Sequence, residues 1–405
     1  MVLSKAKLSI LGVALVIAVA VGVYMWLSNG DDYQSETYTM QDVDGEEVDL
    51  ELTVEKVVDG LDSPWALAFV PDTSQALVTE TSGGLMLIDV DSGDVDEVSG
   101  VPEVDSAGQG GLLDVTISPS FSDDNLIYLT YSAANETGLT STHLGRGSLD
   151  VDSLHLGDFK QLYAAEPFSD STSHYGSRVV VDDDGYLYMS IGDSADKNFA
   201  DHPSQDTSNV LGSTIRLEPD GSIPDDNPFI GDDSVVDEIY TYGHRNVQGM
   251  TIHPDTGDIW QSEHGERDGD EINIIEAGGN YGWPVTHTGC EYGTDTPLGD
   301  HPEDRDDIVD PVFYWECGSG GFPPAGMTFY DHETMSDWRG GLFVGGLASE
   351  YLAHFRLDDG ELKEQEPLLA DRGWRIRDVA ARAEDGALYV VKEGANDGIV
   401  RLSWQ

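Results

Sequence analysis

Asp184-Gly-Tyr-Leu-Tyr-Met-Ser190 is the stretch that decides the fold, because it joins a turn signal to a short run of strand-forming residues. The Asp-Gly pair favours a tight turn, and aromatic residues favour strands. Comparable runs recur along the chain, at Ala76-Leu-Val-Thr-Glu80, Leu126-Ile-Tyr-Leu-Thr130, Asp258-Ile-Trp-Gln-Ser262, Leu342-Phe-Val-Gly-Gly346 and Ala387-Leu-Tyr-Val-Val391. The six copies lie roughly 45 to 85 residues apart, which is in the range of propeller blades with loop insertions of variable length.

Beyond residue 50 the chain shows almost no helical periodicity, which indicates an all-β domain. A two-sheet sandwich would need fewer strands and would not repeat this unit. We therefore predict one six-bladed β-propeller over residues 51–405. The longest intervals, before residues 187, 259 and 342, hold the unusual residues, so we expect insertions on one face to build the site.

The composition is strongly acidic, with 77 Asp and Glu against 20 Lys and Arg and a net charge of -57. Such a surface repels nucleic acid and excludes it as a partner. Hydrophobic residues make up 39% of the chain, enough for a substantial core. The acidic residues are spread along the sequence, which is typical of extreme halophiles, whose surface repulsion is screened at molar salt. Calcium buffering by the whole surface is the less favoured alternative.

Residues 1–28 are predicted to be an N-terminal transmembrane or signal-anchor helix. Lys5 and Lys7 precede an apolar run from Leu8 to Leu27, which is long enough to cross the hydrocarbon core with the N-terminus inside. The propeller would then lie at the extracellular face of the membrane. A cleaved signal peptide and a secreted protein are the alternative, because Ala18-Val-Ala20 resembles a cleavage site.

Residues 29–50 are polar and acidic and are predicted to form a tether. The two cysteines, Cys290 and Cys317, lie in glycine-rich loops. An extracellular pair is more often a disulfide than two free thiols, and no C-x-x-C spacing indicates a metal or redox motif. We therefore favour a structural bridge.

Cations, carboxylates and amides gather around glycines within about forty residues of the second half. The segments are Gly243-His-Arg-Asn-Val-Gln-Gly249, the stretch from Asp255 to Asn273, and Asn280-Tyr-Gly-Trp-Pro284. This density is typical of a loop-built site that binds an anionic ligand and a hard metal together.

Together with further motifs, these segments resemble the pyrroloquinoline-quinone-dependent sugar dehydrogenases, the soluble glucose and aldose dehydrogenase family. The similarity runs from about Gly60 to Arg401, and its strength lies in the order and coverage of motifs that are weak individually. The further motifs are Gly60-Leu-Asp-Ser-Pro-Trp65, Gly108-Gln-Gly-Gly-Leu-Leu113, His174-Tyr-Gly-Ser-Arg178, Asp225-Asp-Asn-Pro-Phe229, Glu263-His-Gly265 and Arg375-Ile-Arg-Asp-Val379.

The resemblance implies oxidation of an aldose at C1 to a lactone. His174 matches the family's proton-abstracting histidine and Asp193 its partner, and a histidine–carboxylate pair suits a general base with a fixed tautomer. Hydride would pass from C1 to C5 of the quinone, and Arg245 would stabilise the negative charge that develops on the quinone oxygen. Neither the preferred sugar nor the electron acceptor is named by the sequence.

The resemblance also implies the positions that bind pyrroloquinoline quinone (PQQ): Gln109, Arg245, Asn246, Arg375 and Arg377. Arginine suits a tricarboxylic quinone because its planar fork binds carboxylates in a bidentate way. The Arg-Ile-Arg spacing on a strand places two of these guanidinium groups on one face. The alternative for the arginines is an ordinary salt bridge to a nearby acid.

Calcium is the second implied cofactor, acting as a Lewis acid against the quinone oxygens. Gly265 and Glu266 match the residues whose carbonyl oxygens hold the cofactor-bound calcium, and Asp270 lies close by. Glu271 and Tyr281 match a second, structural calcium site. The alternative for the acidic residues is a solvated loop.

Three positions depart from the family pattern. Glu266 replaces the usual proline, which we expect to be harmless if only its carbonyl oxygen binds metal. Ala348 stands where soluble glucose dehydrogenase has a lysine that contacts the cofactor, as in the aldose-dehydrogenase branch. Ser173 replaces the aspartate before the base, so the resemblance does not extend to a preference for glucose.

Two other function classes remain open from the residues. A calcium-dependent lactonase needs a metal that activates water but has no use for Arg245, Arg375 and Arg377. A non-catalytic sugar- or protein-binding propeller needs no base beside a cofactor site. Lactone hydrolysis by protein without quinone would favour the lactonase. Failure to take up quinone would favour either the lactonase or the binding propeller over the dehydrogenase.

The charge predicts a dependence of stability on salt. The screening length shortens from about 10 Å at 0.1 M to about 3 Å at 1 M salt, which weakens repulsion among surface carboxylates. We expect the melting temperature to rise steadily with KCl above physiological concentration. A flat dependence between low and molar salt, measured by thermal unfolding, would contradict the halophilic interpretation.

Overall fold

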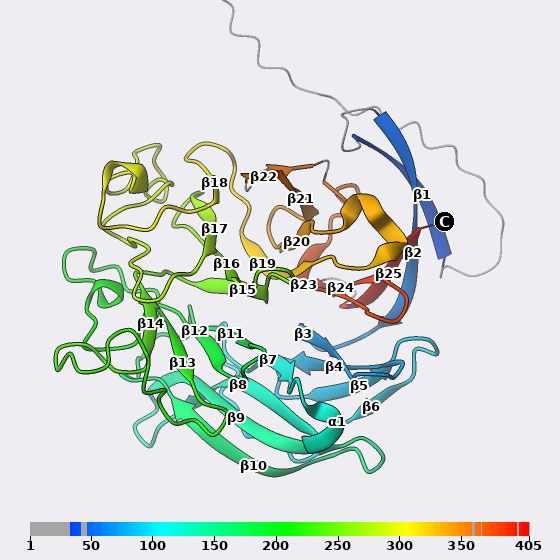
Figure 1. Ribbon diagram of the computed structural model, residues 1–405, viewed down its shortest axis with the longest axis horizontal. Coiled ribbons are helices and arrows are strands. Elements are labelled where there is room, and N and C mark those ends of the chain that lie inside the picture. Colours follow the sequence, from blue (N-terminus) through cyan, green and yellow to red (C-terminus); the bar gives the residue numbers. More distant parts are fainter. Residues whose placement is uncertain (1–32, 42–46, 359–360, 366, 395–396, 405) are drawn as a thin grey trace, which may run out of the picture. The chain divides into compact units, whose positions relative to one another are not determined.

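A computed structural model describes residues 33–404, apart from 42–46, 359–360, 366 and 395–396 (Figure 1). The predicted membrane anchor over residues 1–28 lies outside this part of the chain. Among the described residues, no helix has the length and apolar character that crossing a membrane requires.

The described chain forms six antiparallel sheets (Figure 1). The first contains β3 (Pro64–Phe69), β4 (Gln75–Glu80), β5 (Leu85–Asp89) and β6 (Val95–Glu97). The second contains β7 (Leu112–Ile117), β8 (Leu126–Ala134), β9 (Thr140–Asp150) and β10 (His155–Ala164). The third contains β11 (Gly176–Val181), β12 (Leu187–Ile191), β13 (Ser213–Leu217) and β14 (Ile239–Tyr242).

The remaining sheets follow the same order along the chain. The fourth contains β15 (Val247–Ile252), β16 (Ile259–Glu263), β17 (Asp270–Ile274) and β18 (Phe313–Trp315). The fifth contains β19 (Pro324–Phe329), β20 (Leu342–Gly346), β21 (Leu352–Asp358) and β22 (Glu361–Glu364). The sixth has five strands, β1 (Tyr33–Gln41), β2 (Glu47–Asp59), β25 (Gly398–Trp404), β24 (Leu388–Glu393) and β23 (Arg375–Ala381). The helical turns are short: α1 (Phe121–Asp124), η1 (Pro203–Gln205), η2 (Pro302–Asp304) and η3 (Glu333–Trp338).

The predicted six-bladed propeller is confirmed, because each repeat identified in the sequence is the second strand of one sheet: β4, β8, β12, β16, β20 and β24. The first strands, β3, β7, β11, β15, β19 and β23, each contact the first strands of both neighbouring blades. These six strands therefore surround the central axis.

The ring is closed by pairing between the two ends of the described chain. Strand β2 lies antiparallel to β25, with Leu52 opposite Trp404. The sequence predicts a tether over residues 29–50, but β1 and the first residues of β2 lie within that range. Strand structure thus begins earlier than predicted, because backbone pairing along the edge of the last blade can hold a polar strand that has no apolar pattern of its own.

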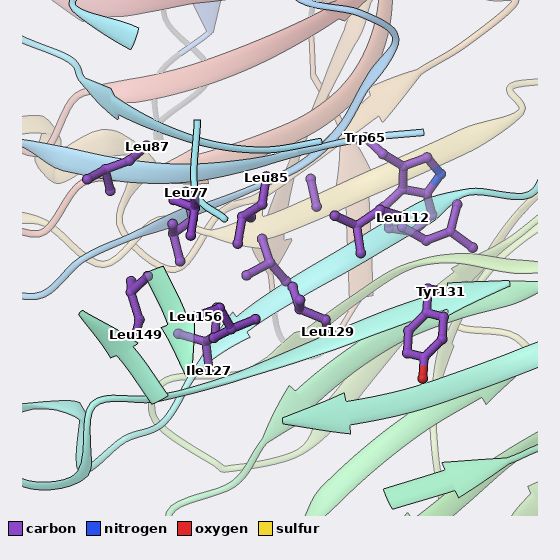
Figure 2. Close-up of a cluster of buried hydrophobic side chains, with 14 of the residues drawn as sticks. Trp65, Leu77, Leu85, Leu87, Leu112, Ile127, Leu129, Tyr131, Leu149 and Leu156 are labelled. Carbon is purple, nitrogen blue, oxygen red and sulfur yellow. The ribbon is translucent and has the colours of Figure 1, made fainter. Parts of the chain in front are cut away.

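The hydrophobic core is divided among the interfaces between neighbouring blades. Figure 2 shows one such cluster, in which Leu77 and Leu85 of the first blade lie near Ile127 and Leu129 of the second. Tyr128, which lies between Ile127 and Leu129 in the sequence, belongs instead to the cluster between the second and third blades. Alternate residues of a second strand thus serve opposite interfaces, which explains why these strands are apolar on both faces.

A buried arginine joins the first strands at the axis. On β11, Arg178 lies 3.1 Å from Asp114 of β7 and 3.2 Å from Asp378 of β23. Its Nε donates to the carbonyl of Gln248 on β15, and its guanidinium lies 4.1 Å from the ring centre of Trp65 on β3. Burial raises the pKa of Asp114 to about 6, although Arg178 opposes the shift. We call Arg178, Asp114 and Asp378 the axial cluster.

The axial cluster predicts a large effect of Arg178→Met on stability. The substitution leaves two buried carboxylates without their cation, and breaking a buried ion pair costs about 3–5 kcal/mol. Arg305→Met is the matched control, since Arg305 pairs with Asp307 at the surface, where solvent screening leaves such pairs little effect on stability. Denaturant unfolding should separate the two variants by at least about 2 kcal/mol. Equal stabilities would mean that the cluster does not hold the blades together.

Candidate functional site

The predicted base and its partner are in direct contact. His174 precedes β11 and Asp193 follows β12, and His174 Nδ1 lies 2.7 Å from Asp193 Oδ1. A Cβ atom at Gly192 would lie 1.9 Å from the His174 carbonyl oxygen, so glycine is required where the two loops meet. Because an ionised carboxylate can only accept, Nδ1 carries the proton and Nε2 is left to accept one.

Asp193 is buried and has further partners that the sequence did not predict. Trp283 Nε1 donates to its second oxygen at 2.9 Å, and His202 Nε2 lies 3.5 Å from the same atom. Burial opposes ionisation of Asp193, but its hydrogen bond to His174 and the nearby charges of His174 and Arg245 outweigh that effect and lower its pKa. The ionised carboxylate of Asp193 therefore favours the tautomer of His174 that carries a proton on Nδ1.

Two predicted cofactor positions adjoin this pair. The side-chain oxygen of Gln109 accepts from the backbone N–H of His174 at 2.8 Å. The backbone N–H of Asp193 donates to the carbonyl of Arg245 at 2.9 Å. The structure therefore brings Gln109, His174, Asp193 and Arg245 together from three different blades.

The side chain of Arg245 is almost fully buried and pairs with Glu266. Arg245 Nη2 lies 2.8 Å from Glu266 Oε2, and the two side chains are 5% and 6% exposed. Lys197 Nζ contacts the same oxygen at 2.5 Å, and the Arg245 guanidinium lies 5.2 Å from the ring centre of Trp283. The Glu266 carboxylate thus pairs with two cations, a side-chain role that the sequence did not predict. The buried Nε of Arg245 has no hydrogen-bond partner among the described residues.

Arg375 and Arg377 lie on one face of β23, as the spacing predicts, and both pair with Glu393. Arg377 Nη1 also donates to the side chain of Gln248 at 3.1 Å. Asn246 is buried, and its side-chain oxygen accepts from the backbone N–H of Gly176 at 3.2 Å. Asn246 thus fixes the loop behind His174.

His264 lies at the centre of the predicted set. Its Nε2 donates to the carbonyl of Pro324 at 2.7 Å. Burial lowers the pKa of His264 to about 3, and the nearby charges of Arg245, His174 and Arg377 act in the same direction. His264 is therefore a neutral imidazole near the base and two of the cofactor arginines, and its carbonyl accepts from Arg245 Nη1 at 3.3 Å.

The predicted residues of the first calcium site share one tight loop. Asp270 accepts from the backbone N–H of Gly265 at 3.0 Å and from that of Phe322 at 2.8 Å. Burial raises the pKa of Asp270 to about 6. Both of its oxygens are thus occupied by the backbone, and Asp270 shapes the loop that presents the carbonyl oxygens of Gly265 and Glu266.

Glu271 and Tyr281 belong to a separate buried network. Burial and the neighbouring Glu263 raise the pKa of Glu271. The hydroxyl of Tyr281 donates to the carbonyl of Ile274, and its ring stacks at 4.5 Å on His244, which bonds to Glu263. Across the described residues, no group of three or more His, Cys, Asp or Glu side chains is arranged to hold a metal.

Cys290 and Cys317 form a disulfide, with their Cα atoms 5.3 Å apart. The backbone of Cys290 also pairs with that of Arg267, beside the loop of Gly265 and Glu266. The preferred structural bridge is confirmed, and it anchors the segment that borders the candidate metal loop.

A cavity of about 1160 Å³ adjoins the site. Asp193, His202 and Asp196 contribute to its wall, whereas His174 and the three arginines do not. The cavity therefore lies beside the candidate catalytic pair rather than containing it.

Contributors that were not predicted include Lys197, His202, Trp283, Gln248, Glu393 and the side chain of Glu266. Trp283 lies within the Asn280-Tyr-Gly-Trp-Pro284 motif, so the sequence did contain a signal for it. No local pattern marks Lys197 or His202, because their roles depend on how the loop after Asp193 folds back over the site.

Comparisons with known proteins identify several similar chains. The glucose/sorbosone dehydrogenase family matches residues 61–401. The aldose sugar dehydrogenase YliI of Escherichia coli is 37% identical over 356 residues, which cover 87% of this chain and 93% of the relative. The solved apo-form of the soluble aldose sugar dehydrogenase of Escherichia coli has a TM-score of 0.81 at 37% identity, covering 87% of this chain and 100% of that chain. The PQQ-bound aldose sugar dehydrogenase of Streptomyces coelicolor has a TM-score of 0.71 at 27% identity, covering 87% and 98%.

Proposed function

The chain belongs to the glucose/sorbosone dehydrogenase family, and on that basis we propose that it oxidises aldose sugars at C1 to lactones with His174 as the base. It is a quinoprotein sugar dehydrogenase. The observation that carries the proposed chemistry is the contact between His174 and Asp193 beside Arg245. The test is aldose oxidation with a dye acceptor at high salt, after reconstitution with quinone and calcium. Absence of any oxidation would overturn the proposal.

The base acts through His174 Nε2. Asp193 holds the proton on Nδ1, so Nε2 can take the proton of the C1 hydroxyl group as the C1 hydride leaves. PQQ, if bound beside these residues, would supply the two-electron oxidant for this reaction. Gln109 holds the backbone of His174 in place, which keeps the imidazole aimed at the substrate hydroxyl.

The cationic residues fit a carboxylated quinone. Arg375 and Arg377 present two guanidinium groups on one strand face, and Arg245 contributes a buried cation with an unpartnered Nε. Arg245 would stabilise negative charge developing on the quinone oxygen, because its guanidinium is already oriented and shielded from water. A lactonase or a simple binding module has no need of this arrangement.

Calcium is the proposed second cofactor. The carbonyl oxygens of Gly265 and Glu266 would hold one ion, in the loop that Asp270 shapes. The raised pKa of Glu271 beside Glu263 suits a second cation, because a divalent ion would relieve the repulsion between two buried carboxylates. A calcium ion held by these oxygens would supply Lewis-acid polarisation.

We also propose that the enzyme works at the extracellular face of a membrane, in a saline medium. The basic residues before the apolar run of residues 8–27 support the anchor, and the disulfide between Cys290 and Cys317 is consistent with an oxidising compartment. The net charge of -57 supports adaptation to high salt.

His174→Gln tests the proposed base. Glutamine cannot accept the proton at the required position, so we expect turnover to fall by about two to four orders of magnitude, while the affinity for quinone changes little. Steady-state kinetics and an absorbance titration of quinone measure the two quantities. Unchanged turnover in a quinone-loaded variant would rule out His174 as the base.

Glu271→Gln and Asp270→Ala test the division between two calcium ions. Glu271→Gln should lower the melting temperature of the calcium-loaded protein and leave quinone affinity little changed. Asp270→Ala should weaken quinone binding and turnover with a smaller loss of stability, because it loosens the loop of Gly265 and Glu266. Identical effects from both substitutions would mean that one calcium site is shared.

A further inference from the structure

We propose that the Glu266 carboxylate is a resident counter-ion of Arg245, which the cofactor must displace when it binds. The inference rests on the proposed function, since it assumes that Arg245 contacts the quinone. It concerns a side chain where the family has proline, so it describes how this chain differs from that pattern. Glu266 is thus assigned as a positioning residue that sets cofactor affinity.

The first support is the burial of the pair. Arg245 and Glu266 are 5% and 6% exposed and lie 2.8 Å apart. Among the described residues, Glu266 is the acid that forms an ion pair with Arg245. A buried guanidinium without an anion is strongly destabilising. Glu266 therefore stabilises Arg245 in the protein without cofactor, at the place where an anionic group of the cofactor would otherwise do so.

The second support is the position of Lys197. Its Nζ contacts the same Glu266 oxygen as Arg245, but its side chain is 53% exposed. Lys197 lies between two exposed rings, 5.8 Å from the ring centre of Phe199 and 5.6 Å from that of Tyr292. Glu266 thus bridges a buried cation and a surface cation. When the carboxylate leaves Arg245, it can keep Lys197 as its partner, which avoids a buried unpaired charge.

The third support is that the backbone of Glu266 is held independently of its side chain. Its N–H donates to His287 Nε2 at 2.9 Å, and the loop is closed by the bond from Gly265 to Asp270. The side chain can therefore change partner while the carbonyl oxygen proposed to bind calcium stays in place. Removing the carboxylate should then affect the competition for Arg245 rather than the shape of the loop.

The test is an absorbance titration of PQQ into the metal-loaded full chain at saturating calcium, comparing wild type with Glu266→Gln. Glutamine keeps an oxygen that can accept from Arg245 but removes the competing charge. We expect its dissociation constant for quinone to fall at least about tenfold, which corresponds to about 1.4 kcal/mol. Asp295→Asn is the matched control. Asp295 is exposed and pairs with Arg267, which follows Glu266 in the chain. Asp295→Asn therefore changes the net charge by the same amount as Glu266→Gln but removes no contact with Arg245.

An unchanged or weaker quinone affinity in Glu266→Gln would overturn the inference, and so would an equal gain in Asp295→Asn. If Glu266→Gln does not fold, Glu266→Asp serves instead, because the shorter side chain draws the carboxylate away from Arg245. It should also bind quinone more tightly than wild type, and failure to do so would count equally against the inference. Absence of quinone uptake by wild type and all variants would instead contradict the proposed function.

Discussion

The architecture depends on a single buried cation, Arg178, on the axis of the propeller. It pairs with Asp114 and Asp378 and so ties together first strands that are far apart in the sequence. The candidate site rests directly on this residue. Arg178 donates to the backbone carbonyls of Arg377 and Gln248. The side chain of Gln248 in turn accepts a hydrogen bond from the Arg377 guanidinium. Loss of the axial cluster would therefore disturb the cofactor arginines as well as the blades.

The distribution of cations is a second feature on which the candidate site depends. The chain has only 20 basic residues against 77 acidic ones, yet Arg245 and Arg377 both lie near His264, and Arg375 shares Glu393 with Arg377. Each arginine is paired with an acid inside the protein, Arg245 with Glu266, whereas Arg375 and Arg377 share Glu393. Under the proposal for Glu266, an acid occupies Arg245 until the cofactor binds, so cofactor affinity would depend on that acid as well as on the arginines.

The fold was predictable because the second strand of every blade carries apolar residues on both of its faces. Strands such as Leu342–Gly346 read as continuous hydrophobic runs, and six of them indicate six blades. The outermost strand β1 was missed because most of its residues are polar and it is held by backbone pairing with β2. In the site, His174 and Asp193 were predicted from motifs. The contact between Lys197 and Glu266 was not predicted, because 69 residues separate them. A local sequence pattern does not indicate which distant loops meet in the folded chain.

The central claim is that this site oxidises a sugar with a bound quinone, and a single-turnover experiment tests it most directly. Protein loaded with quinone and calcium at high salt would receive an aldose without any external acceptor, and both the quinone absorbance and the product would be followed. We predict reduction of the bound quinone and one equivalent of lactone per quinone. An unchanged absorbance, with quinone bound and the sugar unaltered over the range of aldoses tried, would contradict the claim.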